Sequence, residues 1–116
     1  MTLFVEPPQA YLHRDFVDFR KSINGLAAIV ETEMALPLMS GALFVFCNKG
    51  KDKLKILYWD NTGFALWYKR LEKDKFKWPG KLSTPTYSLS AQQFEWLLSG
   101  YDVIGHQPMT FKSVAL

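Results

Sequence analysis

The chain has 116 residues and a mass of 13.4 kDa, enough for one domain with its own core and too few for two. An apolar fraction of 48% with 22% charged residues excludes intrinsic disorder over most of the chain. The single cysteine, Cys47, excludes an intramolecular disulfide and a thiolate zinc cluster. No apolar run is long enough to cross a bilayer, and no signal peptide is readable. We therefore expect a soluble cytoplasmic protein without cofactor or bound metal.

The first third of the chain predicts a strand followed by a helix. Pro7-Pro8 precedes a short strand expected at residues 9–13. From Asp18, apolar residues recur at helical spacing, and Asp18 is the expected N-cap with Asp15 as a rival. Pro37 ends this helix, and a loop over residues 36–41 follows.

The middle of the chain predicts an antiparallel meander. Residues 42–47 are continuously apolar, as in a strand buried on both faces, and turn-forming residues follow at 48–52. Residues 53–59 and 63–71 form two further expected strands around a turn at 60–63. A short run at 75–78 is a possible fourth strand of the meander.

The last third predicts a second helix. Ser90 and Gln93 fit a capping box, and Gly100 is placed to end the helix. Beyond it the sequence has no readable period. The expected fold is α+β, a small antiparallel β-meander of three to five strands packed with two helices on one face. We expect a single domain over residues 1–116, with its core at about 9–104 and an irregular tail at 105–116.

The charge of +3 is unevenly distributed. Residues 49–81 hold ten basic against four acidic side chains, a balance of +6, and the remainder of the chain carries −3. Such a basic block is typical of a phosphate-binding surface. An alternative is a lysine-rich solvated face that prevents exposed strands from pairing with neighbouring molecules. Aromatic side chains interleave the block, and the same two interpretations apply to them: base stacking or packing in the core.

Six cations are the candidate phosphate-contacting residues. Lys69, Arg70 and Lys73 cluster at a predicted strand end, where phosphate binding is the preferred interpretation. Arg20 and Lys21 fall in the first turn of the predicted helix, where cations are disfavoured unless an anion is also bound. Pairing of these two with Asp15 or Asp18 is the alternative. Lys55, in a predicted strand, completes the set.

Catalytic constellations are missing from the sequence. There is no phosphate-binding glycine loop, and neither His13 nor His106 has a neighbour at metal-ligand spacing. Cys47 closes a buried strand, where packing is the preferred interpretation. The carboxylates are scattered, which makes a small metal-dependent nuclease the last of the functional alternatives. We do not expect an enzyme.

Four ordered motifs carry a resemblance to a known family. They are D-F-R-K…G-L at 18–26, G-A-L-F-V-F at 41–46, K-I-L-Y-W-D…G at 55–63 and K-R-L-E…F-K-W-P at 69–79. In this order and at these separations the chain, over about residues 11–100, resembles the TnpB accessory proteins of insertion-sequence family sixty-six. Cys47-Asn48 stands where many relatives carry an arginine, and a phosphate contact at that turn would fall instead to Lys49, Lys51 or Lys53.

The resemblance implies a role in transposition beside a separate, larger transposase that performs the strand cutting. It also implies a bacterial, nucleoid-associated protein. The first hypothesis is a non-catalytic accessory factor that binds DNA at the element ends through the six cations above. The second is a protein–protein adaptor that docks on the transposase without touching DNA, with exposed Trp67 and Trp78 as its anchors. Self-association is compatible with both.

Overall fold

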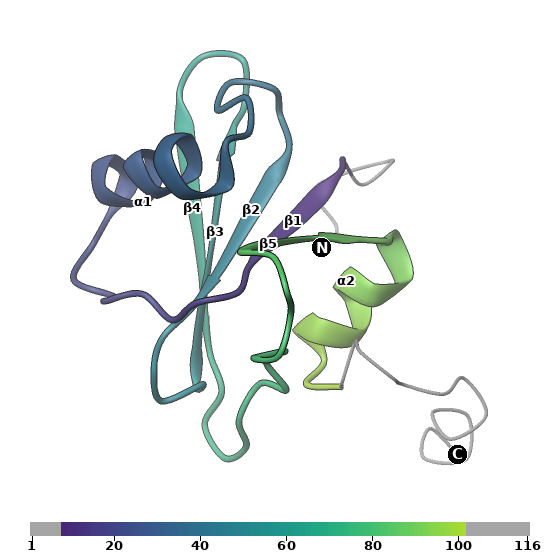
Figure 1. The fold of residues 1–116 in the computed structure, drawn as a ribbon. Coiled ribbons are helices and arrows are strands. Elements are labelled where there is room, and N and C mark those ends of the chain that lie inside the picture. Colours follow the sequence, from purple (N-terminus) through teal and green to yellow (C-terminus); the bar gives the residue numbers. More distant parts are fainter. Residues whose placement is uncertain (1–7, 102–116) are drawn as a thin grey trace.

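The computed structural model describes residues 8–101, which form a five-stranded sheet with a helix on each face (Figure 1). The strands are β1 (Ala10–His13), β2 (Leu43–Cys47), β3 (Lys53–Trp59), β4 (Phe64–Arg70) and β5 (Thr86–Leu89), in the spatial order β4-β3-β2-β1-β5. The helices are α1 (Ile23–Ile29), which continues into the π-helical turn η1 (Val30–Met34), and α2 (Ala91–Leu98). The α+β class is therefore confirmed. The sheet is mixed, because β1 is parallel to β2 and every other pair is antiparallel.

The meander β2-β3-β4 forms as predicted, but the fourth strand does not. Residues 75–78 lie outside the sheet, because the backbone of Phe76 donates to the Lys51 carbonyl in the turn at 2.7 Å instead of to a strand. The strand that completes the sheet is β5, which pairs with β1 from Ala10↔Leu89 to His13↔Thr86. Its four residues, T-Y-S-L, carry too little apolar pattern to be recognised without their partner.

The two helices lie on opposite faces, which corrects the prediction that both cover one face (Figure 1). All five residues of β2 are buried, as predicted. Leu43, Val45 and Cys47 face the core beneath α2, whereas Phe44 and Phe46 face the core beneath α1. Because side chains alternate along a strand, a fully apolar central strand needs cover on both sides.

Helix α1 begins four residues later than predicted, with its N-cap position at residue 22 instead of 18. Asp18 does not cap it, since its carboxylate accepts from the Arg20 backbone N–H at 2.9 Å in a local turn. The N-cap position falls to Ser22, which makes no side-chain capping bond. At the far end η1 closes on Ala35 with φ +53°, just before Pro37.

Helix α2 follows its predicted signals closely. Ser90 and Gln93 form the reciprocal capping box, and Gly100 follows the helix with φ +87°. The expected tail at 105–116 lies outside the described residues. Within residues 8–101, no helix is both long enough and apolar enough to span a membrane.

Candidate nucleic-acid interface

Helix α1 covers only half of its sheet face. On that face, Leu57 of β3 and Phe64 and Leu66 of β4 pack in the core beneath the helix. Further along the same two strands, toward the β2–β3 turn at residues 48–52, the register places Lys55 opposite Tyr68 and Lys53 opposite Arg70. We call these four residues the open half of the α1 face. It carries three cations and one aromatic ring.

A cleft of about 750 Å³ lies over three residues of the open half, Lys53, Lys55 and Tyr68, and Arg70 is not among its lining residues. We call it the sheet cleft, and its wall away from the sheet is the irregular segment 17–20, which precedes α1. Its lining residues are Val17, Asp18, Phe19, Arg20, Asn48, Lys49, Gly50, Lys53, Lys55 and Tyr68. Four of them are cations and one is an acid, so the cleft carries a net positive charge.

Arg20 and Lys21 do not lie in the first turn of a helix, which removes the predicted anion site at a helix N-terminus. The Arg20 guanidinium instead binds Asp18, with Nη2 2.6 Å and Nε 2.9 Å from Oδ2. These hydrogen bonds lower the pKa of the Asp18 carboxyl to about 2. The alternative prediction, that Arg20 pairs with Asp18, is therefore confirmed. The Arg20 side chain is nevertheless 92% exposed. Lys21 is exposed beside it.

The ammonium group of Lys55 is held by hydrogen bonds within the protein. Its ammonium donates to the carbonyl oxygens of Phe19 at 3.0 Å and Lys21 at 2.9 Å, and it lies 4.9 Å from the centre of the Phe19 ring. Desolvation lowers the pKa of Lys55. Lys55 thus fixes segment 17–21 as a wall of the sheet cleft, while its charge still contributes to the potential there.

The three cations around the end of β4 point to different places. Lys69 lies on the opposite face from Arg70 and donates to the Leu98 carbonyl at the end of α2, at 2.8 Å. Arg70 pairs with Glu72 at 2.9 Å, with both side chains more than half exposed. Lys73 is exposed in the following loop. The structure therefore does not gather these three predicted residues in one site.

A second basic cleft, of about 580 Å³, adjoins the first across the β2–β3 turn. Gly50 lines the sheet cleft and the next residue, Lys51, lines this second one, which we call the loop cleft. Its lining residues are Lys51, Lys75, Phe76, Lys77, Trp78, Pro79, Gly80, Lys81 and Leu82. Four of these are lysines and none is an acid. The two clefts make one basic surface at the turn end of the sheet.

The loop cleft owes its form to a local alternation. Lys75 and Lys77 are exposed, whereas Phe76 and Trp78 are buried, and the Trp78 indole donates to the Arg14 carbonyl at 2.9 Å. The sequence K-F-K-W contains this signal, but the same alternation is also typical of the strand predicted at 75–78. Burial of Trp78 also corrects its assignment as an exposed adaptor anchor. Trp67 is half-buried against the α2 core.

Besides Lys51 and Lys75, four lysines outside the predicted set of six line the clefts: Lys49, Lys53, Lys77 and Lys81. Of these, Lys49 and Lys53 were predicted from the sequence as possible phosphate contacts at the turn, whereas Lys77 and Lys81 were not singled out. Each lines one of the two clefts, and within residues 8–101 none of the four ammonium groups has a hydrogen bond or an ion pair. Their positions in the basic block were visible, but which lysines face outward depends on the fold.

Cys47 is a packing residue. It is fully buried in the core beneath α2, and burial raises the pKa of its thiol to about 12. A thiol that remains protonated is a poor nucleophile and a poor metal ligand.

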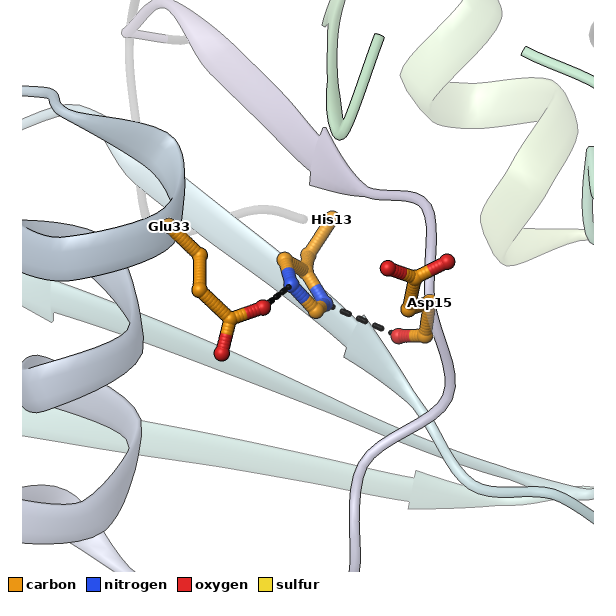
Figure 2. Close-up of side chains that lie close together, drawn as sticks. All are labelled: His13, Asp15 and Glu33. Carbon is orange, nitrogen blue, oxygen red and sulfur yellow. Dashed lines mark hydrogen bonds and ion pairs between the residues drawn. The ribbon is translucent and has the colours of Figure 1, made fainter. Parts of the chain in front are cut away.

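Figure 2 shows the one group within residues 8–101 whose side chains have metal-ligand chemistry and lie close together: His13, Asp15 and Glu33. His13 is buried, with Nδ1 2.8 Å from the Asp15 carbonyl and Nε2 3.0 Å from Glu33 Oε1. The Asp15 carboxylate points away from the His13 ring and accepts a hydrogen bond from Arg14 Nε at 2.9 Å. This hydrogen bond lowers the pKa of the Asp15 carboxyl. Each group thus has a protein partner, and the cluster ties β1 to η1.

Similarity to known proteins identifies the family of this chain. The family described as "IS66 Orf2 like protein" matches residues 8–108. The chain belongs to the IS66 Orf2-like family. It is 37% identical over 86 residues to the "Uncharacterized protein y4jC" of Sinorhizobium fredii, covering 74% of this chain and 73% of that protein. It is 34% identical over 85 residues to "Uncharacterized protein y4hO" of the same organism, covering 73% of each chain. No solved structure matches the fold closely enough to be significant.

Membership of the IS66 Orf2-like family confirms the resemblance drawn from the four motifs. The chain is accordingly an accessory protein of insertion-sequence transposition, in a family with no known catalytic activity.

Proposed function

We propose that this IS66 Orf2-like protein assists transposition by binding DNA through the two basic clefts at the turn end of its sheet. It would act in the bacterial cytoplasm and help a separate transposase to assemble at the element ends. The observation that carries the proposal is the loop cleft, where four lysines meet and no lining residue is acidic.

The form of the loop cleft suits phosphate binding. Its lysines stand around the rigid apolar floor of Phe76 and Trp78, which are 1% and 7% exposed. Lys75 donates to the Gly50 carbonyl at 3.2 Å and so holds the loop against the turn. Lys77 and Lys81 are exposed and have no acidic partner in the described part of the chain. Ammonium groups gathered around a cleft whose lining holds no acid favour a polyanion, whose binding releases counterions.

The proposed phosphate contacts differ in part from the six cations predicted from the sequence. Lys77 and Lys81 in the loop cleft and Lys49 and Lys53 in the sheet cleft become the main phosphate contacts. Arg20, Lys21, Arg70 and Lys73 are exposed at or near the same surface and stay predicted contacts. Lys55 and Lys69 act through the structure, since both donate to backbone carbonyls.

The test is DNA binding by a variant that loses two charges in the loop cleft, K77Q/K81Q. A control, A91E/Q92E, changes the net charge by the same amount at exposed positions of α2 that line neither cleft. We expect K77Q/K81Q to weaken duplex binding by about tenfold or more at low salt and to reduce the slope of log K against log salt by about 0.9 for each lysine–phosphate interaction that is removed. The control should bind like the wild type. Equal weakening in both variants would reduce the effect to net charge and overturn the site.

A pull-down with the transposase separates DNA binding from the adaptor hypothesis. If the transposase is captured from nuclease-treated extract, and the wild-type protein shows no DNA binding on its own, the adaptor function replaces the one proposed here.

A further inference from the structure

Tyr68 stands out on the open half of the α1 face. Its side chain is 51% exposed, although it lies in mid-strand between Leu66, which packs beneath α1, and Arg70. Within residues 8–101, Met39 is the other large apolar side chain that is more than half exposed, and it lines neither cleft. An exposed ring on a basic surface therefore needs an explanation beyond scattered surface hydrophobicity.

The cations around Tyr68 leave its ring uncovered. Its cross-strand neighbour, Lys55, reaches away to the carbonyls of segment 19–21 and to the Phe19 ring. The next pair in the register sets Lys53 opposite Arg70, two like charges directly across a strand pair. Such a pair is destabilising by itself, and nearby carboxylates offset only part of the repulsion: Glu72 bonds Arg70, and the charge of Asp52 acts on both cations. A phosphate bound between Lys53 and Arg70 would add a counter-charge on the cleft side of the pair.

We propose that the sheet cleft binds single-stranded DNA, with one base stacked on Tyr68 and the adjoining phosphates on Lys53 and Arg70. This inference rests on the proposed function and specifies the strand that the sheet cleft takes. Proteins that bind single strands combine a cationic groove with aromatic side chains on which bases stack. In a duplex the faces of the bases are already occupied by their neighbours, so a ring at the floor of a cleft can stack only on an unpaired base.

Chain elements on both sides hold the cleft open for a strand. Segment 17–20 is fixed by the Lys55 hydrogen bonds and by the bond from Val17 N–H to the Cys47 carbonyl at 3.0 Å. The turn on the other side is closed by Asn48, which donates to Asp52 at 2.8 Å and accepts from the Lys53 backbone at 3.0 Å. The ring and the cations are thus positioned before any ligand binds, which lowers the entropic cost of binding.

The experiment measures fluorescence anisotropy of three labelled DNAs of one length: a thymidine strand, the same strand with abasic sites, and a duplex. The proteins are the wild type, Y68F, which keeps the ring, Y68L, which keeps apolar bulk without it, and M39L as a surface control. We expect Y68L to lose about tenfold on the thymidine strand and less than twofold on the abasic strand and the duplex. Y68F and M39L should match the wild type on all three DNAs.

The outcomes separate the two proposals. If Y68L binds all three DNAs like the wild type, or loses the same factor on each, stacking on Tyr68 is overturned while DNA binding stands. If the wild type binds none of the three, the proposed function fails and this inference fails with it. A thermal melt of each variant excludes unfolding as the cause, because an exposed ring contributes little to the core.

Discussion

The covered and open halves of the α1 face belong to the same two strands and differ in what lies over them. On the covered half, Leu57 and Leu66 meet in register beneath the helix. Two and four residues along, the register brings Lys55 to Tyr68 and Lys53 to Arg70, and no helix lies above them. The alternation of the strands is continuous across both halves. What changes is the composition of the face: the covered half carries apolar side chains that are buried by the helix, and the open half carries mostly cations.

The boundary between the halves follows from where α1 begins. Asp18 accepts from the Arg20 backbone, and the chain stays irregular up to Ser22. An earlier start would have placed the first turn of the helix beside the open half. Instead the backbone carbonyls of residues 19 and 21 receive the Lys55 ammonium, and the segment becomes the wall of a cleft. A short local turn therefore separates the packing part of the sheet face from its basic part.

The largest expected effect is the difference in stability between a truncated side chain on the covered half and one on the open half. Leu57 is fully buried on the covered half, so L57A should lower the free energy of unfolding by about 2–5 kcal/mol. Y68A, on the open half, should lower it by about 0.5 kcal/mol or less, in the range of surface substitutions. Urea unfolding of the two variants measures both values. Similar losses would show that the open half is packed like the covered one.

The reactivity of Cys47 tests whether the core beneath α2, on the sheet face opposite the open half, excludes solvent. With its pKa raised to about 12, its thiolate fraction at pH 8 is about 1000-fold below that of an ordinary cysteine. Labelling by a disulfide reagent should be slower than in urea-unfolded protein by at least that factor. Rapid labelling of the native protein would mean that the end of β2, next to the sheet cleft, opens to solvent.

Lys69 and Lys73 allow a smaller comparison between a structural and a surface lysine. K69M removes the bond to the Leu98 carbonyl and should lower the free energy of unfolding by about 1 kcal/mol, since a part-buried acceptor loses a charged donor. K73M should change stability by less than about 0.5 kcal/mol. In denaturant melts, an equal response of the two variants would contradict the structural role of Lys69.

The smallest effect concerns the rim of the sheet cleft. Arg20 lowers the pKa of Asp18 to about 2, so the contribution of this pair to stability is present above the ordinary aspartate pKa and is lost as the pH falls toward 2. Carboxyl NMR of the wild type should give a midpoint near 2. In R20Q the midpoint should rise toward about 4. If it stays near 2 in R20Q, Arg20 is not the group that stabilises the carboxylate.

Local signals predicted the elements that depend on neighbouring residues. The Ser90–Gln93 capping box marked the start of α2, and the apolar run at 42–47 marked a central strand. The signals failed where a distant partner decided the outcome. Strand β5 exists because β1 offers it a free edge, and residues 75–78 are held by the turn at 51 instead. Lys55 and Lys69 look like free cations in the sequence, but each donates to a carbonyl about thirty residues away.

The sequence by itself determined the α+β class, the central meander, the basic block and the family, because these follow from local pattern and from ordered motifs. The tertiary structure decided that the helices lie on opposite faces, that α1 leaves half of its face open, and that the lysines gather around two clefts at the turn end. Those outcomes depend on which side chains find partners across the sheet, and side-chain pairing over long separations is fixed only when the whole chain packs.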